Sequence, residues 1–145
     1  GKDYTGQEHS QNGITVSPNL SDVYISYFGQ RDIRVKIIDN LMVGQQLALH
    51  RDGDKFSIRL PETNHYFGML ARQSQLAQTA SRLFPECRAF SGLEVAGIYR
   101  RSVEMDKKPK PDDGTLWYDG LCSLAIDRGY YHVVEVCGYV QPTIA

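Results

Sequence analysis

The chain has 145 residues, of which 41% are hydrophobic and 23% are charged, and its formal net charge is −1 at pH 7. This composition is typical of a globular protein and argues against disorder of the whole chain. The net charge is nearly neutral, whereas nucleic-acid-binding proteins usually carry an excess of basic residues, so we do not expect a nucleic-acid-binding protein. No apolar run reaches the roughly 18 residues of a membrane span, so we do not expect a transmembrane segment.

Residues 1–13 are polar, contain three glycines and show neither helical nor strand periodicity. We expect a flexible leader over 1–16, followed by a single β-rich globular domain over 17–145. A leader of this kind suits a tether, and a lipid anchor upstream of residue 1 is one form that such a tether could take.

Four strands are predicted in the first half of the chain. Residues 23–28 are β-branched and aromatic, and residues 32–39 alternate between apolar and charged side chains. Residues 45–50 and 55–60 frame the sequence Arg51-Asp52-Gly53-Asp54. Because Asp-Gly is a favoured type I′ pair, these two strands are expected to form a hairpin whose solvated tip holds Asp52 and Asp54 with ordinary pKa values.

The sequence around this turn also contains parts of two known functional motifs, a protein-kinase catalytic loop and an EF-hand calcium loop. His50-Arg51-Asp52 opens like a protein-kinase catalytic loop, but the required asparagine is replaced by Ser57. An EF-hand loop that starts at Asp52 would need an oxygen ligand where Phe56 stands. Both motifs are therefore rejected, and no metal site or cofactor is predicted.

One principal helix is predicted over residues 65–84, where apolar side chains recur at three- and four-residue spacings. Asn64 could cap its start, and Pro85 would end it. Residues 92–105 then read as a strand, 106–114 as a charged loop, and 115–140 as two or three strands. A helix over 115–126 is the rival interpretation, disfavoured because Gly120 would cost a helix about 1 kcal/mol.

The last strands suggest a disulfide. If Gly129-Tyr130 forms the tip of a hairpin, Cys122 lies opposite Cys137, and facing Cα atoms about 4.5–5.5 Å apart can be bridged. Such a bridge implies an oxidising compartment, hence a periplasmic or secreted protein. A bridge from Cys87 to one of these two cysteines is the next possibility, and three free thiols in a cytoplasmic protein are the other alternative.

Catalytic candidates are few. The same register places Asp127 opposite His132, which is half of a catalytic triad, although no nucleophile lies in direct reach. Cys87 is a second candidate nucleophile, but it follows a helix C-terminus, where the dipole does not favour a thiolate. The sequence contains no Gly-x-Ser-x-Gly elbow.

Binding residues are expected at exposed turns and in an aromatic patch, because the chain has nine tyrosines and tyrosine is enriched at interfaces. The candidates are Asp52, Asp54, Lys107, Lys108, Lys110, Asp112, Asp113, Trp117, Tyr118, Tyr130 and Tyr131.

The expected fold is a single α+β domain in which a mainly antiparallel sheet of five to eight short strands packs on one helix; a β-sandwich with an inserted helix is the alternative. The expected function is non-enzymatic binding of another protein, as in an inhibitor, a toxin-immunity protein or a receptor-binding subunit. A small hydrolase or toxin domain that uses Asp127 and His132, or Cys87, is the alternative.

Overall fold

The computed structural model describes residues 12–19, 23–24, 32–118 and 121–143. Its strands are β1 (Ile14–Val16), β2 (Val23–Tyr24), β3 (Gln46–Asp52), β4 (Lys55–Arg59), β5 (Tyr66–Leu70), β6 (Ala89–Ser102), β7 (Lys107–Pro109), β8 (Leu116–Tyr118) and β9 (Tyr130–Pro142). Its helices are α1 (Asp32–Asp39), α2 (Gln75–Leu83), α3 (Ser123–Arg128) and the short 3₁₀ helix η2 (Val103–Asp106).

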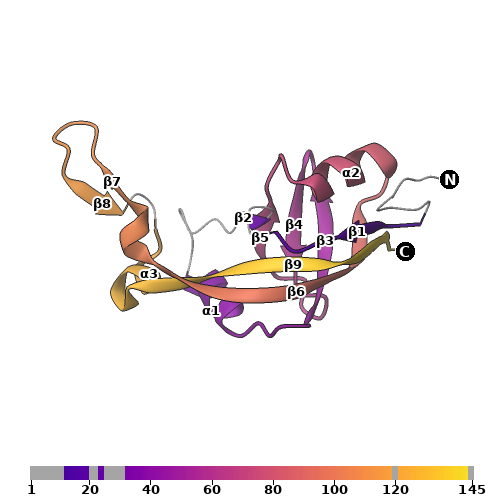
Figure 1. The fold of residues 1–145 in the computed structure, drawn as a ribbon, viewed down its shortest axis with the longest axis horizontal. Coiled ribbons are helices and arrows are strands. Elements are labelled where there is room, and N and C mark those ends of the chain that lie inside the picture. Colours follow the sequence, from indigo (N-terminus) through magenta and orange to yellow (C-terminus); the bar gives the residue numbers. More distant parts are fainter. Residues whose placement is uncertain (1–11, 20–22, 25–31, 119–120, 144–145) are drawn as a thin grey trace.

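Within the described residues, seven strands form one antiparallel sheet in the order β1-β9-β6-β3-β4-β5-β2, and β7 pairs with β8 in a separate hairpin (Figure 1). This confirms the predicted α+β class with a mainly antiparallel sheet. Strands β6 and β9 are the longest and pair from Phe90 opposite Pro142 to Ser102 opposite Tyr130. They form a ribbon that continues beyond the body of the molecule and ends at the β7–β8 hairpin.

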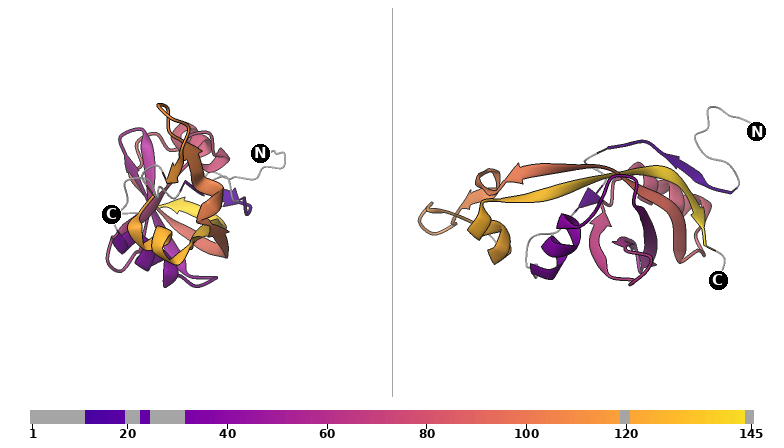
Figure 2. Two further views of the ribbon diagram at one scale, coloured as in Figure 1. Left: turned by 90° about the vertical axis from the view of Figure 1, so that its left-hand side faces the viewer. Right: turned by 90° about the horizontal axis from the view of Figure 1, so that it is seen from below.

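The core lies on the inner side of a strongly curved sheet, where β3, β4 and α1 lie on one side of the β6–β9 ribbon (Figure 2). Alternate residues of the central strands point inward, as the period of two predicts for β3 and β4. The helices add apolar side chains to the same core. Its fully buried members include Val35, Ile38, Leu47, Leu49, Phe56, Ile58, Phe67, Ala80, Phe90, Leu93, Val95, Val134 and Val136.

The β3–β4 hairpin was predicted, but its turn differs in detail. Asp52 pairs with Lys55, so the two turn residues are Gly53 and Asp54. Gly53 has a φ of 68°, whereas Asp54 is not in the positive-φ region. Glycine at the first position with positive φ matches a type II′ turn rather than type I′.

The predicted strand over 32–39 is wrong, since these residues form α1. Val35 and Ile38 are 1% exposed, and Leu41 just beyond the helix is also buried. Ile33, which the alternating pattern places on the same face as Val35, is 56% exposed. The three-residue spacing of the buried side chains therefore decides the structure. Of the strand predicted at 23–28, β2 confirms the first two residues, and the others lie outside the described residues.

The predicted helix over 65–84 is correct only in its second half. Tyr66–Leu70 forms β5, which pairs with β4 on one side and β2 on the other. Helix α2 begins after Ser74, whose hydroxyl accepts a hydrogen bond from the Ala77 amide at 3.0 Å. Asn64 does not cap a helix and instead adopts a φ of 60° just before β5. Apolar spacing alone did not separate the strand from the helix, because both have a buried face.

The end of the chain also departs from the predicted strands. Residues 123–128 form α3, which Gly129 terminates with a φ of 87°. Strand β9 pairs with β6 and β1 instead of with residues 115–128, so Cys137 lies opposite Glu94, and Cys122 is the N-cap of α3. All three cysteines are free, and the predicted disulfide between Cys122 and Cys137 does not form. At the other end, Ile14–Val16, assigned to the leader, forms β1 with both isoleucine and valine side chains buried.

The two backbones of the ribbon approach most closely where Gly138 lies beside Gly92. Both residues have positive φ, and a Cβ atom at Gly138 would overlap the backbone oxygen of Gly92. Gly138→Ala should therefore lower the free energy of unfolding by about 3 kcal/mol, measured by urea denaturation. Gly53→Ala is the matched control, because it has positive φ but open space around it; it should cost about 1 kcal/mol. Equal losses would show that the ribbon relaxes around the added methyl group.

Candidate binding arm

The β7–β8 hairpin, which we call the arm, stands at the outer end of the β6–β9 ribbon, away from β3, β4 and α2 (Figure 1). It contains several of the residues predicted for binding and pairs Lys107 with Tyr118, Lys108 with Trp117, and Pro109 with Leu116. The charged loop predicted over 106–114 is thus the first strand and the tip of a hairpin.

A buried carboxylate anchors the base of this hairpin. Asp106, at the end of η2, is only 8% exposed. It accepts a hydrogen bond from the Tyr131 hydroxyl at 2.6 Å and pairs with the Arg101 guanidinium at 3.1 Å. Burial, followed by the adjacent Asp106 carboxylate, raises the pKa of Tyr131 well above its usual value, so the phenol stays protonated and donates. Tyr131 is therefore an internal anchor, and its predicted place in a surface patch is wrong.

A second cluster joins η2 to β8. The Tyr118 hydroxyl donates to Glu104 at 2.7 Å, and the Lys107 ammonium lies 3.1 Å from the other Glu104 oxygen. These two partners, the tyrosine first, lower the pKa of Glu104. The contacts link both strands of the hairpin to the turn that precedes it and so define how the hairpin leaves the ribbon.

The tip of the hairpin is held by its own hydrogen bonds. The Lys110 amide donates to Thr115 O at 2.9 Å, and the Gly114 amide donates to Lys110 O at 3.0 Å. The Asp113 carboxylate accepts from the Thr115 amide at 2.9 Å, which lowers the pKa of Asp113. Asp112 accepts in the same way from the Asp113 amide. The two aspartates predicted for partner binding thus also shape the turn, a usual role of this residue.

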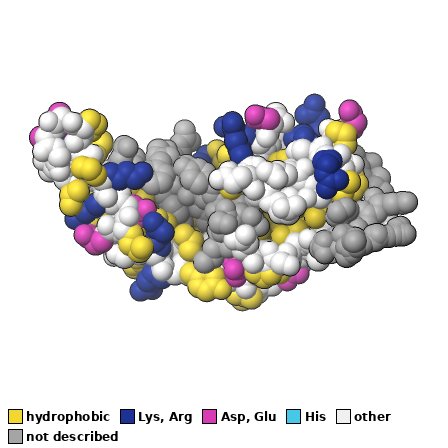
Figure 3. All heavy atoms as spheres, turned by 45° about the horizontal axis from the view of Figure 1, so that its top comes forward, with side chains coloured by type: hydrophobic (Ala, Val, Ile, Leu, Met, Phe, Trp, Pro, Cys, Tyr) yellow, Lys and Arg dark blue, Asp and Glu magenta, His cyan; other side chains and the backbone are white. Residues whose placement is uncertain are grey.

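Large apolar side chains are exposed on and beside the hairpin. Met105 is 68% exposed, Leu116 61% and Trp117 40%. The Lys110 ammonium lies 5.4 Å from the centre of the Trp117 ring, so a cation borders the apolar surface. Figure 3 shows hydrophobic and basic side chains next to one another at this end of the molecule. We call Met105, Leu116 and Trp117 the arm patch.

A charged cluster joins α3 and the outer part of the β6–β9 ribbon to α1. Asp39 of α1 receives both terminal nitrogens of Arg128, at 2.7 and 2.9 Å, and Nδ1 of His132 lies 3.0 Å from the same carboxylate. The guanidinium groups of Arg100 and Arg128 lie over the Tyr130 ring, at 3.9 and 4.4 Å from its centre. Tyr130, which is half-buried at the surface, therefore makes cation–π interactions with two arginines of the protein itself.

The catalytic candidates are not brought together. Asp127 lies in α3 rather than on a strand opposite His132, whose cross-strand partner is Arg100 and whose ring bonds to Asp39. Cys87 follows α2, and its thiol donates to the Ala89 carbonyl at 3.0 Å. Among the described residues, no group of three or more His, Cys, Asp and Glu side chains could hold a metal ion.

The other predicted binding turn, at Gly53, is separate from the arm. Asp52 is not a free solvated carboxylate there, because Ser57 donates to it at 2.7 Å and Arg59 pairs with it at 3.1 Å. These hydrogen bonds, that of Ser57 first, lower the pKa of Asp52, contrary to the predicted ordinary value. Asp54 remains exposed, with Arg72 at 3.8 Å.

Sequence reasoning missed Met105, Leu116 and Asp39. The first two carry a weak signal, since each is an apolar residue at the border of a charged loop. Asp39 carries none, because its partners Arg128 and His132 lie about ninety positions later in the chain.

No protein-family model matches the chain, and comparisons with curated proteins and with solved structures find no significant match. None of the described helices is long and apolar enough to cross a membrane. The functional argument therefore depends on the geometry of the arm.

Tyr131→Phe should loosen the base of the arm, because it removes the hydroxyl that satisfies buried Asp106. We expect a loss of about 2 kcal/mol in the free energy of unfolding, measured in urea. Tyr99→Phe is the matched control, since it removes an exposed tyrosine hydrogen bond to Glu135 on the ribbon and should change stability little. A Tyr131→Phe variant as stable as the Tyr99→Phe variant would contradict the anchoring role.

The Arg128 partnership holds the pKa of Asp39 below its ordinary value of 3.8. A depressed carboxyl pKa contributes stability that is present above 3.8 and is lost as the pH falls through the lower folded-state pKa. Urea midpoints measured from about pH 5 to about pH 2 should therefore fall less steeply in Asp39→Asn than in the wild type. Arg128→Gln should remove the same part of the slope. Three parallel curves would show that this cluster is not a source of acid sensitivity.

Proposed function

We propose that this is a non-enzymatic, protein-binding domain that contacts its partner through the β7–β8 hairpin. The observation that carries the proposal is the arm patch: Leu116 and Trp117 are 61% and 40% exposed on the projecting hairpin, and Met105 is 68% exposed in η2 at its base. Aromatic side chains and methionine are enriched at protein interfaces, and tryptophan is among the residues that contribute most when buried there.

The charges around the patch favour a protein over a nucleic acid. Three basic and two acidic side chains lie between Lys107 and Tyr118, so the hairpin carries a mixed surface. A nucleic-acid site would be expected to show a continuous basic stripe. Mixed charge at the rim of an apolar patch instead resembles the polar border of a protein interface.

The hairpin is organised before any partner arrives. Asp106 is bonded by Arg101 and Tyr131 at its base, and hydrogen bonds from Lys110 to Thr115 shape its tip. A surface that is already ordered loses less conformational entropy on binding, which supports useful affinity from a small area.

For location, the proposal is a secreted or periplasmic domain of the inhibitor, immunity or receptor-binding type. The three cysteines are free, so the disulfide does not support it. Its remaining support is the polar, glycine-containing composition of residues 1–13.

The test is capture of a partner from extracts of the source organism by variants matched in exposed apolar area. The Leu116→Ala/Trp117→Ala variant should lose the partner that the wild type retains, with an affinity loss of about thirtyfold or more. Met42→Ala/Val43→Ala is the control, because these residues are 71% and 68% exposed on the body of the molecule. A partner that binds both variants equally would place the interface elsewhere.

A further inference from the structure

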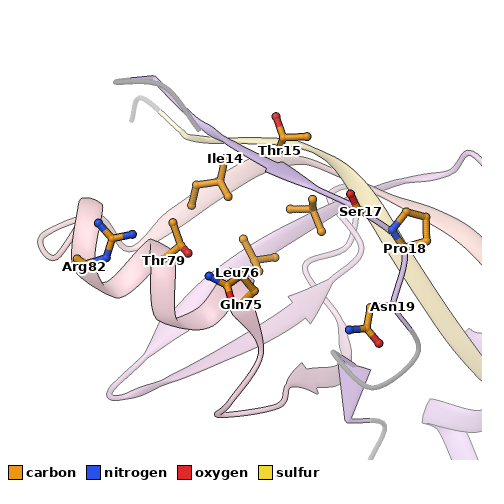
Figure 4. Close-up of a pocket in the computed structure, with 10 residues that line it drawn as sticks. Ile14, Thr15, Ser17, Pro18, Asn19, Gln75, Leu76, Thr79 and Arg82 are labelled. Carbon is orange, nitrogen blue, oxygen red and sulfur yellow. The ribbon is translucent and has the colours of Figure 1, made fainter. Parts of the chain in front are cut away.

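A second surface lies at the end of the molecule away from the arm, where β1 passes beside α2 (Figures 1 and 4). Between them is a cavity of about 380 Å³, within the usual size range of ligand pockets. Ile14 and Val16 of β1 and Leu76 of α2 contribute apolar walls, and Thr79 and Arg82 of α2 contribute polar groups. None of these residues belongs to the arm.

One wall of the cavity is the edge of a sheet. Strand β1 is the first in the strand order and pairs with β9, and among the described residues no strand pairs with its other side. The backbone groups on an open edge can bond to an added strand, which is a common mode of peptide recognition.

The opposite wall holds a buried polar group that lacks a partner. Thr79 is only 4% exposed and lines the cavity, and its hydroxyl makes no hydrogen bond within the described part of the chain. Figure 4 shows Thr79 on the side of α2 that faces β1. Buried side-chain polar groups are bonded in the large majority of cases, so this hydroxyl marks a position where a ligand atom can bond.

The cavity also has a single charged side chain. Arg82, in the last turn of α2, forms no ion pair or hydrogen bond with the described residues, and no acidic residue lines the cavity. A guanidinium without a carboxylate beside it favours an anionic ligand, and a carboxylate can accept two parallel hydrogen bonds from it.

The orientation of the two walls specifies how a peptide would lie. Figure 4 shows β1 and α2 running in opposite directions, with Ile14 near the Arg82 end and Asn19 near the Gln75 end. Every strand pairing that the described residues make in the large sheet is antiparallel. An added strand that continues this pattern runs opposite to β1, so its C-terminal end reaches Ile14 and Arg82.

We propose that this groove binds the C-terminus of an extended peptide, which adds as an antiparallel strand to β1 and places its terminal carboxylate at Arg82. Thr79 bonds to the polar backbone of the peptide, and alternate apolar side chains pack on Ile14, Val16 and Leu76. A terminal carboxylate fits this position because it is negatively charged, as Arg82 requires, and because it lies at the end of the added strand, which is the end nearest to Arg82. This site is independent of the partner bound by the arm.

The test selects ligands for the full 145-residue chain from a library of short random peptides that have free C-termini. The tightest binder is then measured by fluorescence anisotropy as the free acid and as the C-terminal amide. The free acid should bind at least about tenfold more tightly, because the amide loses a charge-assisted interaction with Arg82. Selection of no binder, or equal affinity for the acid and the amide, would overturn the proposal.

Variants localise the site. Arg82→Gln should remove the preference for the free acid, whereas Arg72→Gln, an exposed arginine outside the cavity, should retain it. Thr79→Val should weaken binding without lowering the free energy of unfolding, since it removes a hydroxyl that has no partner in the described residues. Trp117→Ala, in the arm, should bind as the wild type does.

Analytical ultracentrifugation tests whether a second copy of the chain, rather than a peptide, occupies the groove. If the free protein forms a dimer that Arg82→Gln dissociates, a second copy fills the groove and the peptide assignment is wrong. The expected result is a monomer. In NMR spectra its backbone amide resonances at 14–17, 19 and 75–82 should shift on addition of the acid but not of the amide.

Discussion

Strands β6 and β9 pair from Phe90 opposite Pro142 to Ser102 opposite Tyr130, and the rest of the molecule is arranged around this ribbon. At its inner end β6 pairs with β3 and β9 pairs with β1, so both sides of the curved sheet depend on it. At its outer end the same two strands support the β7–β8 hairpin. The ribbon also bends, because the register shifts near Gly92 and Gly138, where the two backbones are too close for a side chain on either residue.

Such a ribbon needs fixing along its length, since two strands alone are only marginally stable in water. Its inner half is covered by the core. Toward the outer end the ribbon is held by two carboxylates. Asp39 joins α1 to Arg128 and His132, and Asp106 joins η2 to Arg101 and Tyr131. The arm is thereby held as an extension of the domain, and it can present exposed apolar side chains in a defined orientation.

The two proposed sites lie at opposite ends of this framework. The arm patch combines exposed apolar area with an ordered turn, which suits a protein surface. The groove between β1 and α2 has an arginine, a buried hydroxyl and a strand edge that, among the described residues, have no partner, and this combination suits the end of a peptide. A domain with both could join two partners, and neither site needs the other to be occupied.

Local pattern was a reliable guide where apolar side chains alternate, as Leu47 and Leu49 do in β3 and Phe56 and Ile58 do in β4, and where Gly53 favours a turn. It failed where one apolar pattern fits two structures. Ile33, Val35 and Ile37 alternate as in a strand, while Val35 and Ile38 have the spacing of a helix, and only packing against β5 and β9 selects α1. The residues of the arm were located by composition, but Tyr131 was taken for a surface residue, because neither its burial nor its hydrogen bond to Asp106 can be read from its neighbours in the sequence.

The sequence by itself determined the α+β class, the antiparallel sheet, the β3–β4 hairpin and the charged, aromatic composition of residues 106–118. The tertiary structure decided that β9 pairs with β6, that Cys122 and Cys137 stay apart, that Asp39 meets Arg128, and that β1 leaves a groove beside α2. The physical reason is the distance along the sequence between the residues that interact. Turns and alternation depend on residues a few positions apart, whereas strand order and ion pairs depend on which distant segments bury the same core.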